Sequence, residues 1–103
     1  MAQVGKPYSY AAAGPDAYDC SGLTMASWGA AGVSLPHFSG AQYDDFPHVS
    51  MSQLPPGDLV FPSDPGSHVA LYAGGGMVVE ATHTGDFVHY WPMRSEFVLA
   101  ARP

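Results

Sequence analysis

Glycine and proline are spread along the whole chain, and this limits how long any helix or strand can be. The 103 residues include 12 glycines and 10 prolines, with no repeat and no low-complexity segment. Because these residues favour turns and interrupt regular structure, we expect many short elements joined by tight connections. Hydrophobic residues still make up 47% of the chain, which is enough to form a core. We therefore expect one folded domain over residues 1–103.

The first half of the chain is predicted to hold two helices. Residues 19–31 are the best candidate, because the carboxylate of Asp19 can accept a free backbone N–H of the first turn. Gly32 can end that helix. A shorter helix is predicted over residues 39–44, with Ser39 as its cap.

From Pro55 onward the pattern is typical of short β-strands. Turn signals separate short apolar runs, and three consecutive glycines at 74–76 indicate a hairpin. Strands are predicted over residues 59–61, 68–73, 77–82, 87–91 and 97–101, with an extended lead-in stretch over residues 7–10. Helices followed by an antiparallel sheet predict an α+β fold.

The charge balance argues against several kinds of partner. Three basic residues against nine acidic ones give a net charge of −6. The chain thus lacks the basic face that nucleic-acid binding or docking on anionic lipid requires. No apolar run approaches the roughly 20 residues of a membrane span, and the first residues do not have the order of a signal peptide. We expect no nucleic-acid partner and no membrane insertion.

Cys20 is the only cysteine, so the chain cannot form an internal disulfide. It follows Asp19 and would lie in the first turn of the predicted helix. Backbone N–H groups and the positive end of the helix dipole point at that position and favour the nucleophilic thiolate. A lone cysteine is as often a small buried hydrophobic residue, and its position alone does not decide between the two roles.

A nucleophilic thiol needs a base, and His68 and Glu80 are the candidates for a base and its partner. A hairpin centred near Gly75 places positions 68 and 80 on the same sheet face, about 5–8 Å apart. The carboxylate could then orient the imidazole. A slip of one residue would put the two on opposite faces. The alternatives are a structural histidine and a solvated glutamate, although the neighbours of Glu80 are unusually apolar for a solvated residue.

The remaining histidines suggest no other established type of site. Each of His37, His48, His83 and His89 is more often structural than functional. One cysteine is too few for a structural zinc site, and no H-E-x-x-H pattern occurs, although His83 and His89 could approach His68. The motifs of serine hydrolases and phosphate-binding loops are also absent from the sequence. We expect no metal and no cofactor.

The segment Asp19-Cys20-Ser21-Gly22-Leu23 resembles the nucleophile motif of the NlpC/p60 family of papain-like peptidoglycan endopeptidases. Three further segments resemble family motifs in the same order: the lead-in at 7–10, the turn and strand at 55–61, and the histidine strand at 67–72. Residues 35–43 resemble the actinobacterial branch, which includes the mycobacterial cell-division hydrolases. The order and spacing of the motifs extend the resemblance over nearly the whole chain.

The resemblance implies a papain-like α+β core, with the cysteine helix packed on the antiparallel sheet. It implies Cys20 as nucleophile, His68 as base and Glu80 as the third catalytic residue. Tyr8 matches a tyrosine beside the nucleophile and would support the oxyanion together with the Cys20 backbone N–H. The positions expected to contact substrate are Asp19, Ser21 and Ser67.

The implied reaction is hydrolysis of peptidoglycan stem peptides between D-γ-glutamate and meso-diaminopimelate, through a thioester. Peptidoglycan lies outside the cytoplasmic membrane, so we expect an extracellular or cell-envelope location, and we expect a monomer. Two other functions remain open: a non-catalytic peptidoglycan-binding module on the same fold, and an amidase or acyltransferase that also forms a thioester.

Two departures from the family pattern concern the substrate groove. The family lead-in usually ends in Trp-Gly-Gly, whereas this chain has Tyr10-Ala11-Ala12. The segment between the lead-in and the nucleophile is also short, so a loop that narrows the groove in relatives could be missing. Neither departure changes Cys20, His68 or Glu80, and we expect activity.

Overall fold

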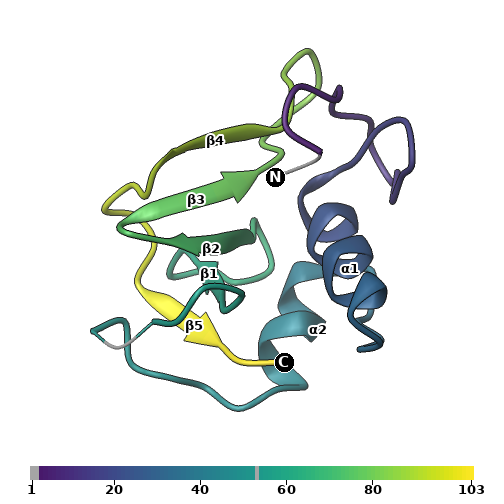
Figure 1. Ribbon diagram of the computed structural model, residues 1–103. Coiled ribbons are helices and arrows are strands. Elements are labelled where there is room, and N and C mark those ends of the chain that lie inside the picture. The colour runs from purple at the N-terminus through teal and green to yellow at the C-terminus, as the bar shows by residue number, and fades with distance from the viewer. Residues whose placement is uncertain (1–2, 53) are drawn as a thin grey trace.

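Two helices are followed along the chain by a five-stranded antiparallel sheet (Figure 1). The computed structural model describes residues 3–52 and 54–103. The elements are α1 (Cys20–Ala30), α2 (Ser39–Asp44), β1 (Leu59–Phe61), β2 (Ala70–Gly74), β3 (Met77–Glu80), β4 (His89–Pro92) and β5 (Leu99–Ala101). This arrangement confirms the expected α+β fold. Within the described ranges, no helix has both the length and the apolar composition of a membrane span.

Helix α1 begins and ends where the sequence predicts. Asp19 is its N-cap, and its carboxylate accepts the backbone N–H of Gly22 at 2.6 Å. At the other end, Gly32 takes a φ of +88°, and the N–H of Val33 turns back to the carbonyl of Trp28 at 2.9 Å. A left-handed glycine of this kind is a common way to end a helix. These caps fix Cys20 as the first helical residue.

Helix α2 lies where it was predicted, but its predicted cap is wrong. Phe38 in extended conformation occupies the N-cap position, and Ser39 is already helical and buried. The polar group that ties this segment down is the side chain of Gln42. Its amide donates to the carbonyls of Ser21 and Pro36, at 3.0 and 2.8 Å. The helix is therefore anchored by a buried amide instead of a side-chain cap.

The sheet has the strand order β4-β3-β2-β1-β5, with antiparallel pairing throughout. In the β2–β3 hairpin, Leu71 pairs with Val79 and Tyr72 with Val78. This is the register expected from a turn centred near Gly75. Strand β2 begins at residue 70 and not at 68, because a turn anchored on Asp64 extends as far as Ser67. His68 therefore lies just before the strand instead of within it.

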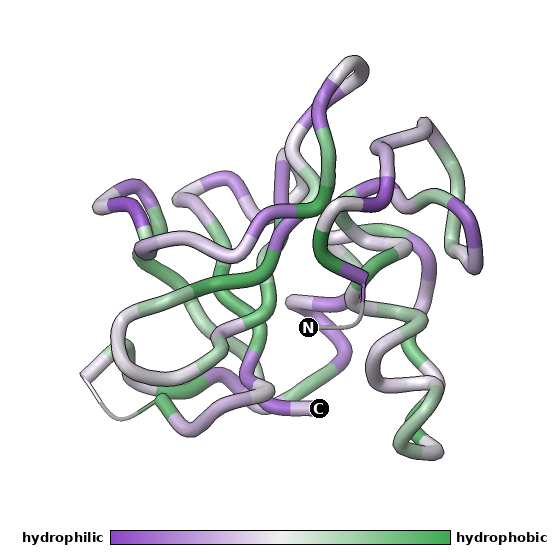
Figure 2. The backbone as a smooth tube through the Cα atoms, turned by 45° about the horizontal axis from the view of Figure 1, so that its top comes forward, coloured by the Kyte–Doolittle hydropathy of each residue, from purple (hydrophilic) through white to green (hydrophobic). Residues whose placement is uncertain are grey.

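The core fills both sides of the sheet. Leu59 and Phe61 of β1 pack with Trp28 of α1, on the side that the two helices cover (Figure 1). Val60 points the other way and packs with Phe97. Because both faces are covered, all three residues of β1 are buried. In Figure 2 the strands carry the more continuous hydrophobic colour, and the outer loops are largely hydrophilic.

The lead-in before α1 differs from the expected extended stretch over residues 7–10. Single bridges join Pro7 and Tyr8 to the rest of the fold, but the chain turns at Tyr10. Ala11 takes a φ of +63° and is the only non-glycine residue with positive φ in the described ranges. The lead-in then passes so close to α1 that a Cβ at Gly22 would collide with its backbone.

Replacing Ala11 with glycine should stabilise the fold by about 0.5–1 kcal/mol. A left-handed conformation costs an L-residue about 1–2 kcal/mol, and the greater freedom of glycine in the unfolded chain offsets part of that gain. Ala11 is exposed, so no packing is lost. Urea unfolding would measure the change. Ala30→Gly, at an exposed position of α1, is the matched control and should destabilise. An Ala11→Gly variant that is less stable than the wild type would contradict this reading of the turn.

Candidate active site

Cys20 lies at the N-terminus of α1 and lines a cleft of about 340 Å³. The walls of this cleft come from the lead-in, from the segment before α2 and from the turn before His68. The lining residues are Tyr8, Tyr10, Ala11, Asp19, Cys20, Ser21, His37, Phe38, Ser39, Gly66 and Ser67. A larger hollow of about 450 Å³ lies at the other end of α1, but no ionisable side chain lines it. We therefore place the candidate site at Cys20.

His68 is the base that interacts with the Cys20 thiol, and its side chain is only 13% exposed. Burial by itself lowers the pKa of this imidazole. Hydrogen bonds to the Cys20 thiol and to the Glu80 carboxylate outweigh burial and raise the pKa of His68 to about 9. Nε2 of the ring is held by Glu80, which leaves Nδ1 for the thiol. At neutral pH the ring is therefore protonated beside the sulfur.

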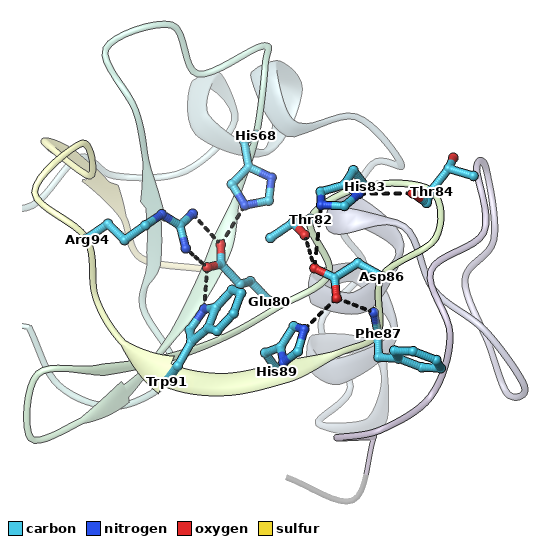
Figure 3. A network of polar contacts seen from close by, with 10 residues as sticks. All are labelled: His68, Glu80, Thr82, His83, Thr84, Asp86, Phe87, His89, Trp91 and Arg94. Carbon is cyan, nitrogen blue, oxygen red and sulfur yellow. Dashed lines mark hydrogen bonds and ion pairs between the residues drawn. The ribbon is translucent and has the colours of Figure 1, made fainter.

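Glu80 is fully buried at the end of β3, and its carboxylate is saturated by donors (Figure 3). Oε2 accepts from Nε2 of His68 at 2.7 Å and from Arg94 at 3.1 Å. Oε1 accepts from the indole N–H of Trp91 at 2.6 Å and from the other terminal nitrogen of Arg94. Burial raises the pKa of this carboxyl, but these donors reverse the effect and hold it well below its ordinary value.

The contact between His68 and Glu80 follows from the hairpin register. With Leu71 opposite Val79, position 68 falls diagonally across from position 80 on the same face. The alternative of a solvated Glu80 is wrong, because none of its side chain is exposed. A buried carboxylate is expensive unless it is paired and hydrogen-bonded, as it is here.

Asp19 has three partners, which tie helix α1 to two walls of the cleft, the lead-in and the segment before α2. Oδ1 accepts from Gly22 N–H and from Nε2–H of His37, at 2.6 and 2.9 Å. Oδ2 accepts from the N–H of Ala11 at 2.9 Å. The capping role expected of Asp19 is confirmed. Its carboxylate is already occupied by protein groups, so its larger contribution is to position the cleft walls around Cys20.

The other predicted site residues also reach the cleft. Tyr8 lines it, and burial, followed by the nearby Cys20 and Asp19, raises the pKa of its phenol, which therefore remains a hydrogen-bond donor. Ser21 is buried, directly after Cys20. Ser67 lies on the wall beside His68, and its hydroxyl donates to the carbonyl of Asp64 at 2.7 Å.

Sequence reasoning missed two residues that hold Glu80, namely Trp91 and Arg94. One signal could have found Arg94: a buried carboxylate needs a cation, and the chain has only three basic residues. Trp91 carried no such signal, because its indole reaches Glu80 only through the pairing of β3 with β4. The exposed aromatic ring of Phe38 on the cleft wall was missed as well.

Three other histidines, His48, His83 and His89, do not line the Cys20 cleft. His48 stacks on Tyr43, with ring centroids 3.8 Å apart. His83 and His89 gather around Asp86, which accepts from Nε2 of His89 at 2.6 Å (Figure 3). Among the residues that the structure describes, no group of three or more His, Cys, Asp or Glu side chains is arranged to hold a metal ion.

The site combines a thiol at a helix N-terminus with an imidazole and a buried carboxylate that hydrogen-bonds to it. The model of the NlpC/P60 family matches residues 5–101. The chain belongs to the NlpC/P60 family, as the motifs around Cys20 and His68 indicate.

Two curated relatives of this chain are named as endopeptidases. The probable endopeptidase p60 of Listeria monocytogenes is 47% identical over 92 residues, which cover 84% of this chain and 19% of p60. The peptidoglycan endopeptidase RipA of Mycobacterium tuberculosis is 38% identical over 109 residues, which cover 92% of this chain and 23% of RipA. The chain thus spans about a fifth of the length of these curated relatives.

Solved structures of RipA and of RipD share the fold. A structure of RipA, mutated at a cysteine, matches with a TM-score of 0.90 and 35% identity, over 99% of this chain and 57% of that chain. Two other RipA structures are mutated at a histidine and at a glutamate. RipD of Mycobacterium tuberculosis matches with a TM-score of 0.86 and 32% identity, over 98% of this chain and 88% of that chain. It is described as a non-catalytic NlpC/p60 domain protein adapted to peptidoglycan binding.

The hydrogen bond between Cys20 and His68 predicts a specific change in titration. In the wild type, the pKa of His68 should lie near 9, so the ring stays protonated until the pH approaches that value. Cys20→Ala removes one of the two partners that raise this pKa and should therefore lower it, whereas His48→Gln, outside the cleft, should leave it unchanged. Imidazole NMR titration would measure both variants. A pKa of His68 that does not fall in Cys20→Ala would show that the thiol and the ring do not interact.

Proposed function

We propose that this chain is a cysteine peptidase that hydrolyses peptidoglycan stem peptides at the bond between D-γ-glutamate and meso-diaminopimelate. The observation that carries the proposal is the fully buried Glu80 carboxylate, whose Oε2 lies 2.7 Å from Nε2 of His68. The interaction with Cys20 raises the pKa of that imidazole. Burying a charge contributes little to stability on average, so a chain that keeps one behind an imidazole at a cleft is arranged for chemistry.

The first half of the proposed reaction breaks the peptide bond. The Cys20 thiolate attacks the γ-carbonyl carbon of the D-glutamyl residue, and the carbonyl electrons move onto oxygen. The Cys20 backbone N–H, together with the phenol of Tyr8, stabilises that oxyanion. Protonated His68 then gives its Nδ1 proton to the departing amine of diaminopimelate, the C–N bond breaks, and a thioester remains on Cys20.

The second half regenerates the enzyme. Neutral His68 takes a proton from a water molecule, which attacks the thioester carbonyl. The C–S bond breaks and returns the thiolate beside the protonated ring. Glu80 holds the ring orientation in both halves and stabilises its charged form. Substrate is held along the cleft by Ser21 and Ser67, while Asp19 keeps the cleft walls in place.

The comparisons support the residue assignment at one point beyond family membership. In the RipA structures the mutated glutamate lies twelve positions after the mutated histidine. Glu80 lies twelve positions after His68 in this chain. Since RipA is named a peptidoglycan endopeptidase, the same kinds of residue at the same separation favour the same role here.

The peptidoglycan-binding module is the second candidate function, and the RipD description is the observation that favours it. A module that only binds has no need of a protonated imidazole between a thiol and a buried carboxylate, and this chain retains all three groups. Both functions imply a peptidoglycan partner. They also imply an extracellular or cell-envelope location, in keeping with the cell-wall enzymes that it resembles.

The proposal predicts cleavage of the muropeptide L-Ala-γ-D-Glu-meso-diaminopimelate by the wild type and none by Cys20→Ala. Mass spectrometry of the products identifies the broken bond, and circular dichroism shows that the variant is folded. Adding a primary amine separates hydrolysis from acyl transfer, because only transfer gives an amide product.

Each other outcome has a defined meaning. Cleavage by folded Cys20→Ala would remove Cys20 from the nucleophile position. Absence of cleavage by the wild type, with retention on insoluble peptidoglycan, would replace the peptidase by a binding module.

A further inference from the structure

Arg94 holds both oxygens of the Glu80 carboxylate from the side away from the cleft. It lies in the connection between β4 and β5, and its two terminal nitrogens donate to Oε1 and to Oε2. Planar pairing of this kind fixes the direction of a carboxylate as well as its charge. Arg94 does not line the cleft. Its hydrogen bonds to the proposed catalytic groups are the two that it makes to Glu80.

The guanidinium of Arg94 is itself held on three sides. Its Nε donates to Glu96 at 2.7 Å, and its central carbon lies 5.7 Å from the Trp91 ring and 5.1 Å from the Phe97 ring. Phe97 in turn lies 5.9 Å from the ring of His68. Side chains whose rotamers are fixed by packing can hold a site within the tolerance that catalysis needs.

The chain offers no other strong base to this carboxylate. Lys6 donates to the carbonyl of Pro15 at 2.7 Å, and Arg102 pairs with Asp58 at 2.9 Å. The groups that face Glu80 are His68, Trp91 and Arg94 (Figure 3). Cys20 in turn interacts with His68, and Glu96 pairs with Arg94. Beyond Trp91 lies the pair of His89 and Asp86, with His89 stacked on the indole.

We propose that Arg94 is a positioning residue that keeps Glu80 ionised and directed at Nε2 of His68, so that Nδ1 of the ring stays on Cys20. The inference rests on the proposed function and deepens it, because Arg94 then joins Cys20, His68 and Glu80 as a fourth side chain on which the reaction depends. Without Arg94, the buried carboxylate would keep only His68 and Trp91 as partners. It would then protonate more readily and could rotate away from the imidazole.

The test compares Arg94→Met and Arg94→Lys in this chain, with Arg102→Met as the matched control for losing an arginine–carboxylate pair elsewhere in the fold. NMR titration of the Glu80 carboxyl carbon needs no substrate. In Arg94→Met this titration should move to higher pH by about 1–3 pH units. The kcat should fall about 10- to 100-fold with KM nearly unchanged, because orientation is lost while the cleft is intact.

The Arg94→Lys variant separates the effect of the positive charge at position 94 from its effect on the orientation of the Glu80 carboxylate. It keeps the positive charge but not the paired geometry, so the Glu80 titration should stay near the wild-type value while kcat is still reduced. Arg102→Met should lose thermal stability and keep both the Glu80 titration and kcat.

An Arg94→Met variant with wild-type Glu80 titration and wild-type kcat would overturn the proposal, even if its thermal stability fell as far as that of Arg102→Met. If Arg94→Met does not fold, wild-type kcat in Arg94→Lys overturns the directing role. If the wild-type chain cleaves no muropeptide, the proposed function fails, and the Glu80 titration still decides whether Arg94 keeps the carboxylate charged.

Discussion

The arrangement of the site depends on one buried negative charge, the carboxylate of Glu80. A carboxylate with none of its side chain exposed can stay ionised only if nearly all of its lone pairs are satisfied by donors. His68 supplies those donors from the segment before β2, and Trp91 and Arg94 supply them from β4 and the connection after it. Satisfying the charge therefore also fixes the imidazole ring, and the ring fixes the position of the proton beside Cys20.

Local rules of folding bring the two halves of the site together. A turn of glycines sets the register of the β2–β3 hairpin, and the register sets Glu80 diagonally across from His68. On the other side, Asp19 caps α1 and binds the backbone of Ala11, so one carboxylate both starts the helix that carries Cys20 and shapes the wall of the cleft. Gly22 is needed because the lead-in passes where its side chain would be.

The parts of this account that could be predicted from sequence are those set by local chemistry. Asp19 and Gly32 marked the ends of α1, and the glycine turn predicted which face Glu80 would share with His68. The missed parts depend on long-range packing. Trp91 and Arg94 reach Glu80 only after β4 has paired with β3. At α2, Phe38 takes the N-cap position instead of Ser39, because the side chain of Gln42 anchors this helix against α1. The left-handed Ala11 gave no local signal, since alanine rarely adopts that conformation.

The most direct test of the central claim is the kcat of Glu80→Gln on a muropeptide substrate, measured beside His68→Ala. Proton transfer by a positioned base contributes about 10²–10⁴-fold, so His68→Ala should lose activity on that scale. Glu80→Gln keeps the shape of the side chain but removes the charge that orients the ring, and its kcat should fall between those of the wild type and His68→Ala. A kcat equal to that of the wild type would contradict the account, because the buried charge would then have no part in the reaction.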